Sequence, residues 1–308
     1  MKRIKIPFLK PVVPPHVFCL LDDGVTYARV RDEAPEGFVE ARNFKYPTGS
    51  LGGPSGGAPL LTREAVAEVV KAARALSGGR LTRASVVYPD AWARILPVEL
   101  ETMPARREAG TEMVLWKLKK LLPQLPAEVE VVYEAMPVLS EEKRVLAATT
   151  ARAAIEAIDR SFGELGVRVG YMAPASLALF EGLAPALSSA AGGDYALLHR
   201  FGGSTTFFIA RGTDPIFFRQ RPPGADEDQD QEARLSLSYY AERLKGPGLR
   251  AVYVHDADPD GGLAKVSAFP VPPVSLSGRL FDADPGFDER VKARPELMAA
   301  FAAVLGKS

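Results

Sequence analysis

The sequence predicts an α/β protein built from two related lobes, with a smaller α+β segment inserted into the first lobe. Two observations predict this class. An order of three strands, one helix and a further strand occurs twice along the chain. The stretch between the two copies has a different order of predicted helices and strands. The chain has 308 residues, 47% of them hydrophobic and 25% charged. This is an ordinary composition for a soluble globular protein with two sizeable cores.

The first copy opens with a hairpin. Residues 16–31 contain two apolar runs that meet at Asp23 and Gly24. This pair is favoured in tight turns because both positions tolerate positive φ. Residues 38–47 are predicted to form the third strand.

A glycine-rich loop and a helix follow. The segment 48–59, "TGSLGGPSGGAP", lacks the Gly-Lys-Ser/Thr of a phosphate-binding loop, so we expect a flexible surface loop. Thr62 is placed to cap the next helix. The apolar face of that helix is formed, at helical spacing, by Val66, Val69, Val70 and Ala73. Residues 83–89 are predicted to form the next strand.

The second copy repeats this order. Its strand pair covers residues 194–201 and 204–211, and its third strand covers residues 214–222. After the acidic run "ADEDQDQEA", helical spacing returns at Leu235, Tyr239, Tyr240 and Leu244. Residues 249–256 complete the copy as a strand, so the two copies match in pattern although they share few residue identities.

The stretch between the copies predicts a small αββα subdomain. A helix at residues 111–123 ends at Pro123, because proline cannot continue the hydrogen-bond ladder. Its apolar face is formed by Val114, Leu118, Leu121 and Leu122. Two strands follow at residues 128–136 and 143–149. A second helix carries its apolar residues at Ala151, Ile155, Ile158, Phe162 and Leu165.

These segments define the predicted domains. A strand at residues 166–174 and the helix after it return to the first lobe, and a last helix opens at Pro295. We therefore place the lobes and the insertion as follows: the first lobe at residues 1–90 and 166–192, the inserted subdomain at residues 91–165 and the second lobe at residues 193–308.

Charge and cysteine content exclude several functional classes. Lys plus Arg and Asp plus Glu both total 38, which argues against a nucleic-acid partner. The single cysteine, Cys19, excludes an intramolecular disulfide and a cysteine-based zinc site. No stretch approaches the roughly 20 apolar residues that cross a bilayer. We therefore expect a cytoplasmic protein without a membrane span of its own.

The histidines do not predict a metal site or a catalytic one. His16, His199 and His255 are far apart in the chain and lack metal-ligand spacing, so we expect no metal. His199 would act as a base only with Ser204 or another nucleophile beside it, and no third orienting group is evident.

The middle of the chain resembles a known family. The run "VVYPDAWARILPVELETMP…TEMVLWKLKKLLP" is similar to the inserted-subdomain signature of PilM, the actin-like protein of type IV pilus assembly. "VGYMAPASLALF" resembles that family's return segment, and "FGGSTTFFIARGTDPIFFRQR" resembles its second-lobe hairpin. The similarity covers roughly residues 15–306. The glycine turns alone are not specific.

The resemblance implies a fold and a partner. It implies the actin/FtsA-like fold, with duplicated RNase H-like lobes and an insertion in place of actin's usual subdomain. It also implies a scaffold at the inner membrane that binds the cytoplasmic tail of a bitopic protein like PilN and meets components of the pilus motor or platform. The cytoplasmic domain of the type II secretion protein GspL is a close structural cousin, so a GspL-like component stays an alternative. Homo-oligomerisation is left open.

The resemblance also locates a nucleotide cleft. In actin-like folds, two hairpin turns hold the phosphates of ATP through backbone N–H groups, and acidic residues near the turns help to place Mg²⁺. In this chain Arg200 stands where the family has the acid of its second turn. The turn itself survives as Gly202, Gly203, Ser204, Thr205 and Thr206. Arg200 either holds a phosphate directly or pairs with a nearby carboxylate.

The other two turns depart further from the family pattern. The first keeps only Asp22, Asp23 and Gly24, with Arg29 as the nearest cation downstream. The adenine-side turn brings acidic side chains toward the ligand, at Asp256, Asp258 and Asp260. We therefore expect a degenerate cleft, no cofactor and no catalysis. An active ATPase that binds ATP and Mg²⁺ is the alternative, whereas a sugar kinase would need intact phosphate turns.

Two surfaces of the insertion are candidates for binding. A groove between the first lobe and the insertion is expected to take the partner's tail at a sheet edge. Its predicted walls are Val98, Leu100, Trp116 and Tyr133, although Trp116 also fits an ordinary core position. The basic helix has Lys117, Lys119 and Lys120 to meet acidic lipid headgroups or an acidic partner, or to form a solvated face.

Overall fold

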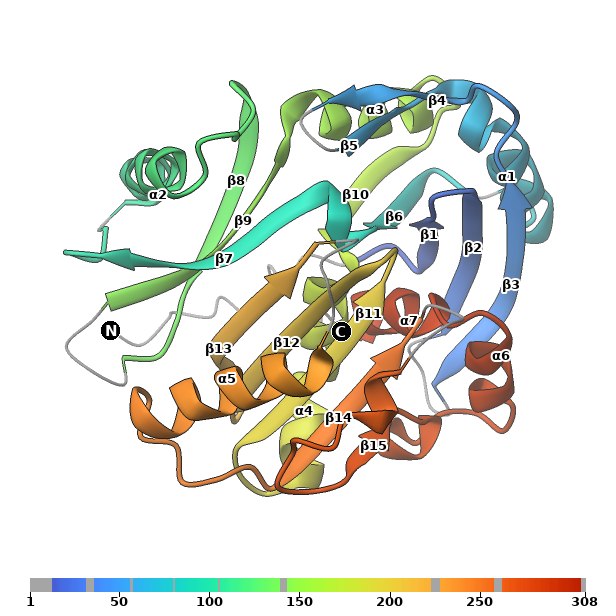
Figure 1. The fold of residues 1–308 in the computed structure, drawn as a ribbon. Coiled ribbons are helices and arrows are strands. Elements are labelled where there is room, and N and C mark those ends of the chain that lie inside the picture. Colours follow the sequence, from blue (N-terminus) through green and yellow to red (C-terminus); the bar gives the residue numbers. More distant parts are fainter. Residues whose placement is uncertain are drawn as a thin grey trace.

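The computed structural model describes residues 13–31, 36–55, 58–79, 81–104, 106–138, 143–222, 228–257 and 262–305. Two five-stranded sheets dominate the molecule, and a three-stranded sheet projects from one side (Figure 1). The two large sheets have the same topology. Each has three antiparallel strands followed by two parallel ones, and the first strand lies in the centre. The predicted duplication is therefore confirmed.

The first sheet has the order β10-β6-β1-β2-β3. Its strands are β1 His16–Leu20, β2 Gly24–Arg31, β3 Gly37–Lys45, β6 Arg83–Tyr88 and β10 Arg168–Pro174. The predicted hairpin between β1 and β2 is present, closed by a bond from the Leu21 N–H to the Gly24 carbonyl (2.8 Å). The predicted apolar face of α1 (Arg63–Leu76) is buried against this sheet.

One segment differs from its prediction. Residues 48–59 were expected to be a loop, yet β4 (Leu51–Ser55) and β5 (Ala58–Leu61) pair as an antiparallel hairpin. Glycine and proline give no alternating pattern of side chains, so periodicity cannot detect such strands. Leu51 and Leu61 face each other where the two strands meet the rest of the lobe.

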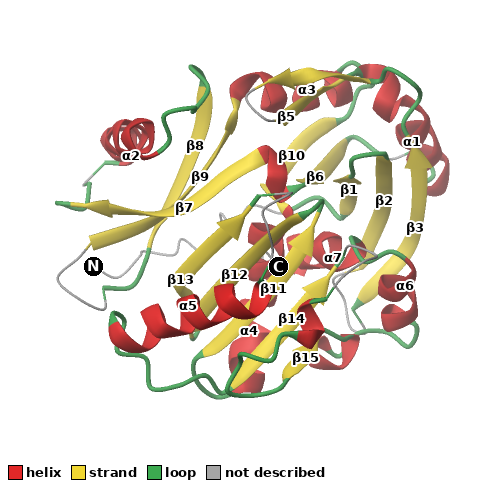
Figure 2. Ribbon diagram, viewed as in Figure 1, coloured by secondary structure: helices red, strands yellow, loops and turns green. Residues whose placement is uncertain are grey.

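The second sheet has the order β13-β12-β11-β14-β15. Its strands are β11 Tyr195–Phe201, β12 Ser204–Arg211, β13 Asp214–Arg221, β14 Ala251–Asp256 and β15 Pro273–Ser275. Helix α5 (Gln229–Glu242) covers one face and α4 (Ala175–Ala191) the other (Figure 2). The remaining described helical segments of this half are η2 Leu263–Lys265, η3 Gly278–Phe281, α6 Phe287–Ala293 and α7 Leu297–Leu305.

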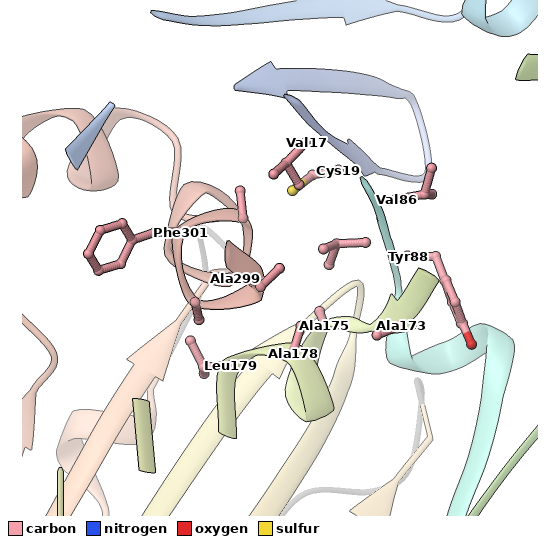
Figure 3. Packing of buried hydrophobic residues seen from close by; sticks show 14 of the residues in the cluster. Val17, Cys19, Val86, Tyr88, Ala173, Ala175, Ala178, Leu179, Ala299 and Phe301 are labelled. Atoms are coloured by element: carbon pink, nitrogen blue, oxygen red, sulfur yellow. The ribbon is translucent and has the colours of Figure 1, made fainter. Parts of the chain in front are cut away.

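Helices α4 and α7 connect the two lobes. α4 follows the first sheet in sequence but packs on β11 and β12, whereas α7 follows the second sheet but packs on β1, β2 and β6. The two helices also pack on each other, so one continuous core reaches from Val17 and Val86 to Leu179 and Phe301 (Figure 3). The lobes therefore share a core.

The contact of α4 with α7 predicts a large effect of adding one methyl group. A Cβ at Gly182 would lie 2.0 Å from the backbone oxygen of Ala302. Overpacking of this kind costs about 1–3 kcal/mol, so Gly182→Ala should lower the free energy of unfolding by at least that amount in a denaturant titration. Gly163→Ala is the matched control, because no atom lies within 4 Å of its added methyl. Equal stability of both variants would contradict the packing described.

The insertion is a three-stranded antiparallel sheet of order β7-β9-β8 with α2 on one face. Its elements are η1 Asp90–Trp92, β7 Ala93–Leu100, α2 Arg107–Leu121, β8 Val129–Ala135, β9 Lys143–Ala151 and α3 Arg152–Gly163. Helix α2 starts four residues earlier than predicted, and Leu121 is 54% exposed because it lies in the last turn. Helix α3 packs on α1 and β5 and contributes Phe162 to the lobe core.

The edge of β7 lies along β13 of the second lobe. The side chain of Gln220 on β13 links the two strands. It accepts a hydrogen bond from the Ile95 N–H and donates to the carbonyls of Asp90 and Ala93. In the described part of the chain, no helix is both long and apolar enough to span a membrane.

Candidate functional site

The β11–β12 turn contains the residues predicted to contact phosphate. Gly202 and Gly203 form the turn with φ angles of 59° and 70°, values that side chains of L-residues rarely allow. The turn lies against the first lobe. A Cβ added to Gly202 would be 3.1 Å from the Cβ of Pro89 and 4.0 Å from Oδ2 of Asp22. The two predicted phosphate turns therefore nearly touch.

Two of the three hydroxyl side chains after this turn, Ser204 and Thr206, are buried. Thr206 donates its hydroxyl to the carbonyl of His199 (3.3 Å). Thr205 accepts a bond from Nε of Arg200 (3.3 Å), and this arginine is only 9% exposed. Ser204 is fully buried. Thr205 and Thr206 therefore link β12 to β11.

The first turn is tight, and Arg29 is not beside it. Gly24 is required here, since a Cβ would be 2.4 Å from the carbonyl oxygen of Phe44. Arg29 is the nearest cation downstream of the turn. In the β1–β2 register it lies opposite His16, at the end of the hairpin away from the turn. At about 3.3 Å per residue, its backbone lies more than ~10 Å from the turn. The carboxylate of Asp22 is instead the group that lies toward Gly202.

The third turn begins at Asp256, opposite Arg200 in the β11–β14 register. Its carboxylate accepts a bond from the N–H of Leu263 (3.3 Å). Asp258 and Asp260 lie outside the described residues.

Beneath the turns lies a buried polar cluster that sequence analysis missed. Asp90 follows β6 and accepts two bonds from Ser176, one from its N–H (3.0 Å) and one from its hydroxyl (2.8 Å). Asp90 thereby caps the first turn of α4, where a carboxylate is favoured. Its other oxygen is 3.9 Å from Nε2 of His199, too far for a hydrogen bond. Nδ1 of His199 lies 3.0 Å from Nδ1 of His255.

Burial sets the charge of this cluster. It raises the pKa of Asp90 to about 7, although the bonds from Ser176 lower the pKa in part. Burial also lowers the pKa of His199 well below its usual value and that of His255 to about 4. All three groups therefore favour their neutral forms, as expected where charge would be desolvated.

His199 and Ser204 are not hydrogen-bonded to each other as a base and a nucleophile would be. Asp90 and His199 resemble two members of a catalytic triad, but no hydrogen bond links His199 to the Ser204 hydroxyl, which has no partner among the described residues. The cluster joins the two sheets, since Asp90 follows β6 of the first sheet while His199 lies in β11 of the second sheet. In the described ranges, no three His, Cys, Asp or Glu side chains are grouped as metal ligands.

A groove of about 550 Å³ lies between the inserted sheet and α4. Leu146 of β9 and Leu177 and Phe180 of α4 give it apolar walls. Strand β8 borders it and pairs only with β9 among the described strands, so its other edge is unpaired. Val132 of β8 is 53% exposed. The groove therefore offers an apolar surface beside a free strand edge.

Acidic side chains surround this apolar surface. Glu134 of β8, Glu181 of α4 and Asp214 at the start of β13 all line the groove, and no Lys or Arg is among its lining residues in the described chain. The groove therefore suits a ligand that combines apolar and basic groups.

Only one of the four predicted wall residues lines this groove. Tyr133 borders the groove, but its side chain lies on the α2 side of the sheet, where its hydroxyl donates to the carbonyl of Arg107 (3.3 Å). Val98 and Leu100 are buried in the core between the inserted sheet and α2, so neither side chain lines the groove. Trp116 lies on α2, on the opposite side of the sheet, and is 53% exposed rather than part of the core. Alternation along a strand predicts two faces, but not which of them a helix covers.

Comparison with known proteins gives a fold but no family assignment by sequence. No family model and no curated protein matches the chain. A chain of a PilM–PilN type IV pilus biogenesis complex superimposes with a TM-score of 0.70 at 18% identity, covering 96% of this chain and 98% of that one. A Bacteroides thetaiotaomicron protein of unknown function with the actin-like ATPase fold gives a TM-score of 0.53 at 11% identity, with coverages of 97% and 99%.

A third likeness is weaker. The cytoplasmic domain of EpsL, an inner-membrane component of the Vibrio cholerae type II secretion system, gives a TM-score of 0.48 at 11% identity, with coverages of 86% and 91%. The chain therefore has the actin-like fold, and the resemblance to PilM is confirmed at the level of the fold.

Proposed function

We propose that this protein is a non-enzymatic scaffold of a pilus assembly machine, which holds the cytoplasmic tail of a PilN-like inner-membrane protein in the groove between β8 and α4. The observation that carries the proposal is the groove itself, with its apolar walls, acidic surroundings and unpaired strand edge. The structural likeness to a chain of a PilM–PilN complex supports the choice of partner.

The chemistry of the groove matches such a tail. An extended peptide can add a strand to a free sheet edge, where backbone bonds give affinity and side-chain pockets give specificity. Cytoplasmic segments beside membrane helices are enriched in Lys and Arg. Basic side chains on the tail would meet Glu134, Glu181 and Asp214, while its apolar residues would lie against Leu146 and Leu177. Through this tail the protein would be peripheral at the inner membrane.

The interlobe cleft is proposed to be degenerate. Arg200 stands where an acid would orient the metal, and Asp22 lies where phosphate oxygens would approach Gly202. A carboxylate repels a triphosphate, and the close contact with Pro89 leaves little room between the turns. We therefore assign no ATP, Mg²⁺ or catalytic step to the cleft. An ATP-binding protein is the second candidate, because Gly202 and Gly203 keep the turn geometry.

A calorimetric titration tests the partner assignment. The titrant is a synthetic peptide of the cytoplasmic tail of the PilN-like protein from the same cell. One-to-one binding with a micromolar or lower Kd, in buffer without nucleotide, supports the scaffold. No binding of the peptide, with or without Mg·ATP, refutes it. Binding that appears only with Mg·ATP favours the second candidate.

A further inference from the structure

The outward face of α2 carries an exposed aromatic ring among lysines. Trp116 is 53% exposed. Nζ of Lys120 lies 3.5 Å from the centre of its ring, and Nζ of Lys117 lies 5.8 Å from it. Lys119 is on the same turn and is also exposed. We name Trp116, Lys117, Lys119 and Lys120 the Trp–Lys ridge.

The fold does not require this ring for packing. Val114 and Leu118 are fully buried and attach α2 to the inserted sheet. Trp116 is two residues from each of them, so it lies on the opposite side of the helix. Trp side chains are enriched at interfaces where one part of the ring is apolar and its N–H is hydrated, so the exposed ring of Trp116 suits such a contact.

The charge of the ridge is unusual for this chain. Residues 113–125 hold three lysines and no acid, whereas the whole chain has equal numbers of basic and acidic residues. At the start of the helix, Arg106 and Arg107 are accompanied by the exposed acids Glu108 and Glu112, so the excess of positive charge lies in the second half of α2. Leu121, 54% exposed, adds apolar surface at its end. The ridge therefore combines cationic and apolar groups on one convex helix.

We propose that the Trp–Lys ridge docks directly on an anionic bilayer surface. The indole is suited to the headgroup region, where one part of the ring is apolar and its N–H is hydrated. Lysines keep their ammonium groups at the phosphates while their methylenes lie along the apolar boundary. Clustered lysines near the surface of an anionic bilayer are each attracted by about 1 kcal/mol, a several-fold gain in affinity. The ridge gives the protein a lipid contact of its own, in addition to any partner.

The position of the ridge leaves the groove accessible. Side chains alternate along β9, so Val145 and Ala147 face α2 while Leu146 and Ala148 face the groove. The ridge and the groove thus lie on opposite sides of the inserted sheet. The proposed lipid contact does not rest on the proposed peptide binding, and either can fail without the other.

The two tryptophans make the test direct. Trp92 is 5% exposed and stacked on Tyr88, so a change of emission on mixing with vesicles reports Trp116. The probe is phosphatidylcholine vesicles containing about 30% phosphatidylglycerol, an anionic composition that attracts basic segments. We expect binding in a flotation assay, a blue shift and quenching by brominated lipid. Trp116→Phe should remove the blue shift and the quenching.

Charge reversal with a matched control distinguishes the effect of the ridge lysines on vesicle binding from the effect of the protein's net charge. Lys119→Glu with Lys120→Glu should weaken vesicle binding at least ~10-fold, since each surface lysine contributes several-fold. Lys71→Glu with Lys292→Glu makes the same charge change at two exposed lysines outside the ridge and should leave binding unchanged. Three outcomes would overturn the proposal: no binding to the anionic vesicles at low salt, equal binding to pure phosphatidylcholine, or an equal loss in the control pair.

Discussion

Leu146→Arg is expected to weaken binding of the tail peptide more than ~100-fold, a loss of about 2.7 kcal/mol. Leu146 lines the groove from β9, beside the edge strand. The substitution removes apolar contact area and puts a cation in the groove, where it competes with the peptide's basic residues for the acidic side chains. Burial and charge therefore both oppose binding. Calorimetry on the folded variant, with circular dichroism to check the fold, gives the measurement.

Val132→Arg is a second variant, and we expect it to leave the stability of the fold unchanged. This side chain is 53% exposed, so the arginine remains solvated in the free protein. We expect a ~10-fold loss of affinity, because Val132 lies at the border of the groove. Val39→Arg is the matched control, since it makes the same change at a side chain 52% exposed on β3, outside the groove. If the control weakens binding as much as Val132→Arg does, the peptide does not lie in this groove.

The second large effect concerns Asp90 and pH. The folded-state pKa of Asp90 is raised to about 7 from an ordinary value of 3.8. Between these values the folded state holds a proton that the unfolded state releases, so this group favours folding at low pH and loses that contribution as pH rises toward 7. Asp90→Asn cannot titrate. From about pH 5 to about pH 8, the wild type should therefore lose about 2–3 kcal/mol of stability relative to Asp90→Asn.

Denaturant titrations of both proteins at the two pH values measure this difference. His199 has a lowered pKa and gives the opposite slope below about pH 6.5. Both proteins contain it, however, so its contribution cancels in the comparison. Asp90→Ala distinguishes the effect of the charge from that of the hydrogen bonds. It leaves the Ser176 N–H and hydroxyl without their acceptor, so it should lower the free energy of unfolding by about 1–3 kcal/mol even at pH 5. A stability difference that does not change with pH would show that Asp90 is charged in the fold.

Local signals in the sequence were enough to predict the two lobes. Hairpins are marked by residues such as Asp23 and Gly24, and helices by apolar spacing, and both signals act over a few residues. The repeated order of elements then implies two similar sheets. The glycine-rich hairpin of β4 and β5 was missed, because glycines leave no side-chain pattern.

The buried cluster was missed for another reason. Asp90, His199 and His255 lie in three separate segments, and they meet only because the strand order places the ends of β6, β11 and β14 around the start of α4. The same limit applies to the groove. Its position depends on which face of the inserted sheet α2 covers, and this is a tertiary choice that alternation along β7 and β8 leaves open.

A calorimetric titration of Mg·ATP into the purified protein tests the central claim most directly. We attribute function to the groove, and we propose that Arg200, Asp22 and the close approach of the two turns keep nucleotide out of the cleft. We therefore expect no saturable heat up to millimolar Mg·ATP, and none with ATP and a metal chelator. Stoichiometric binding with a micromolar Kd, lost when Gly202 is replaced by a bulky residue, would contradict it.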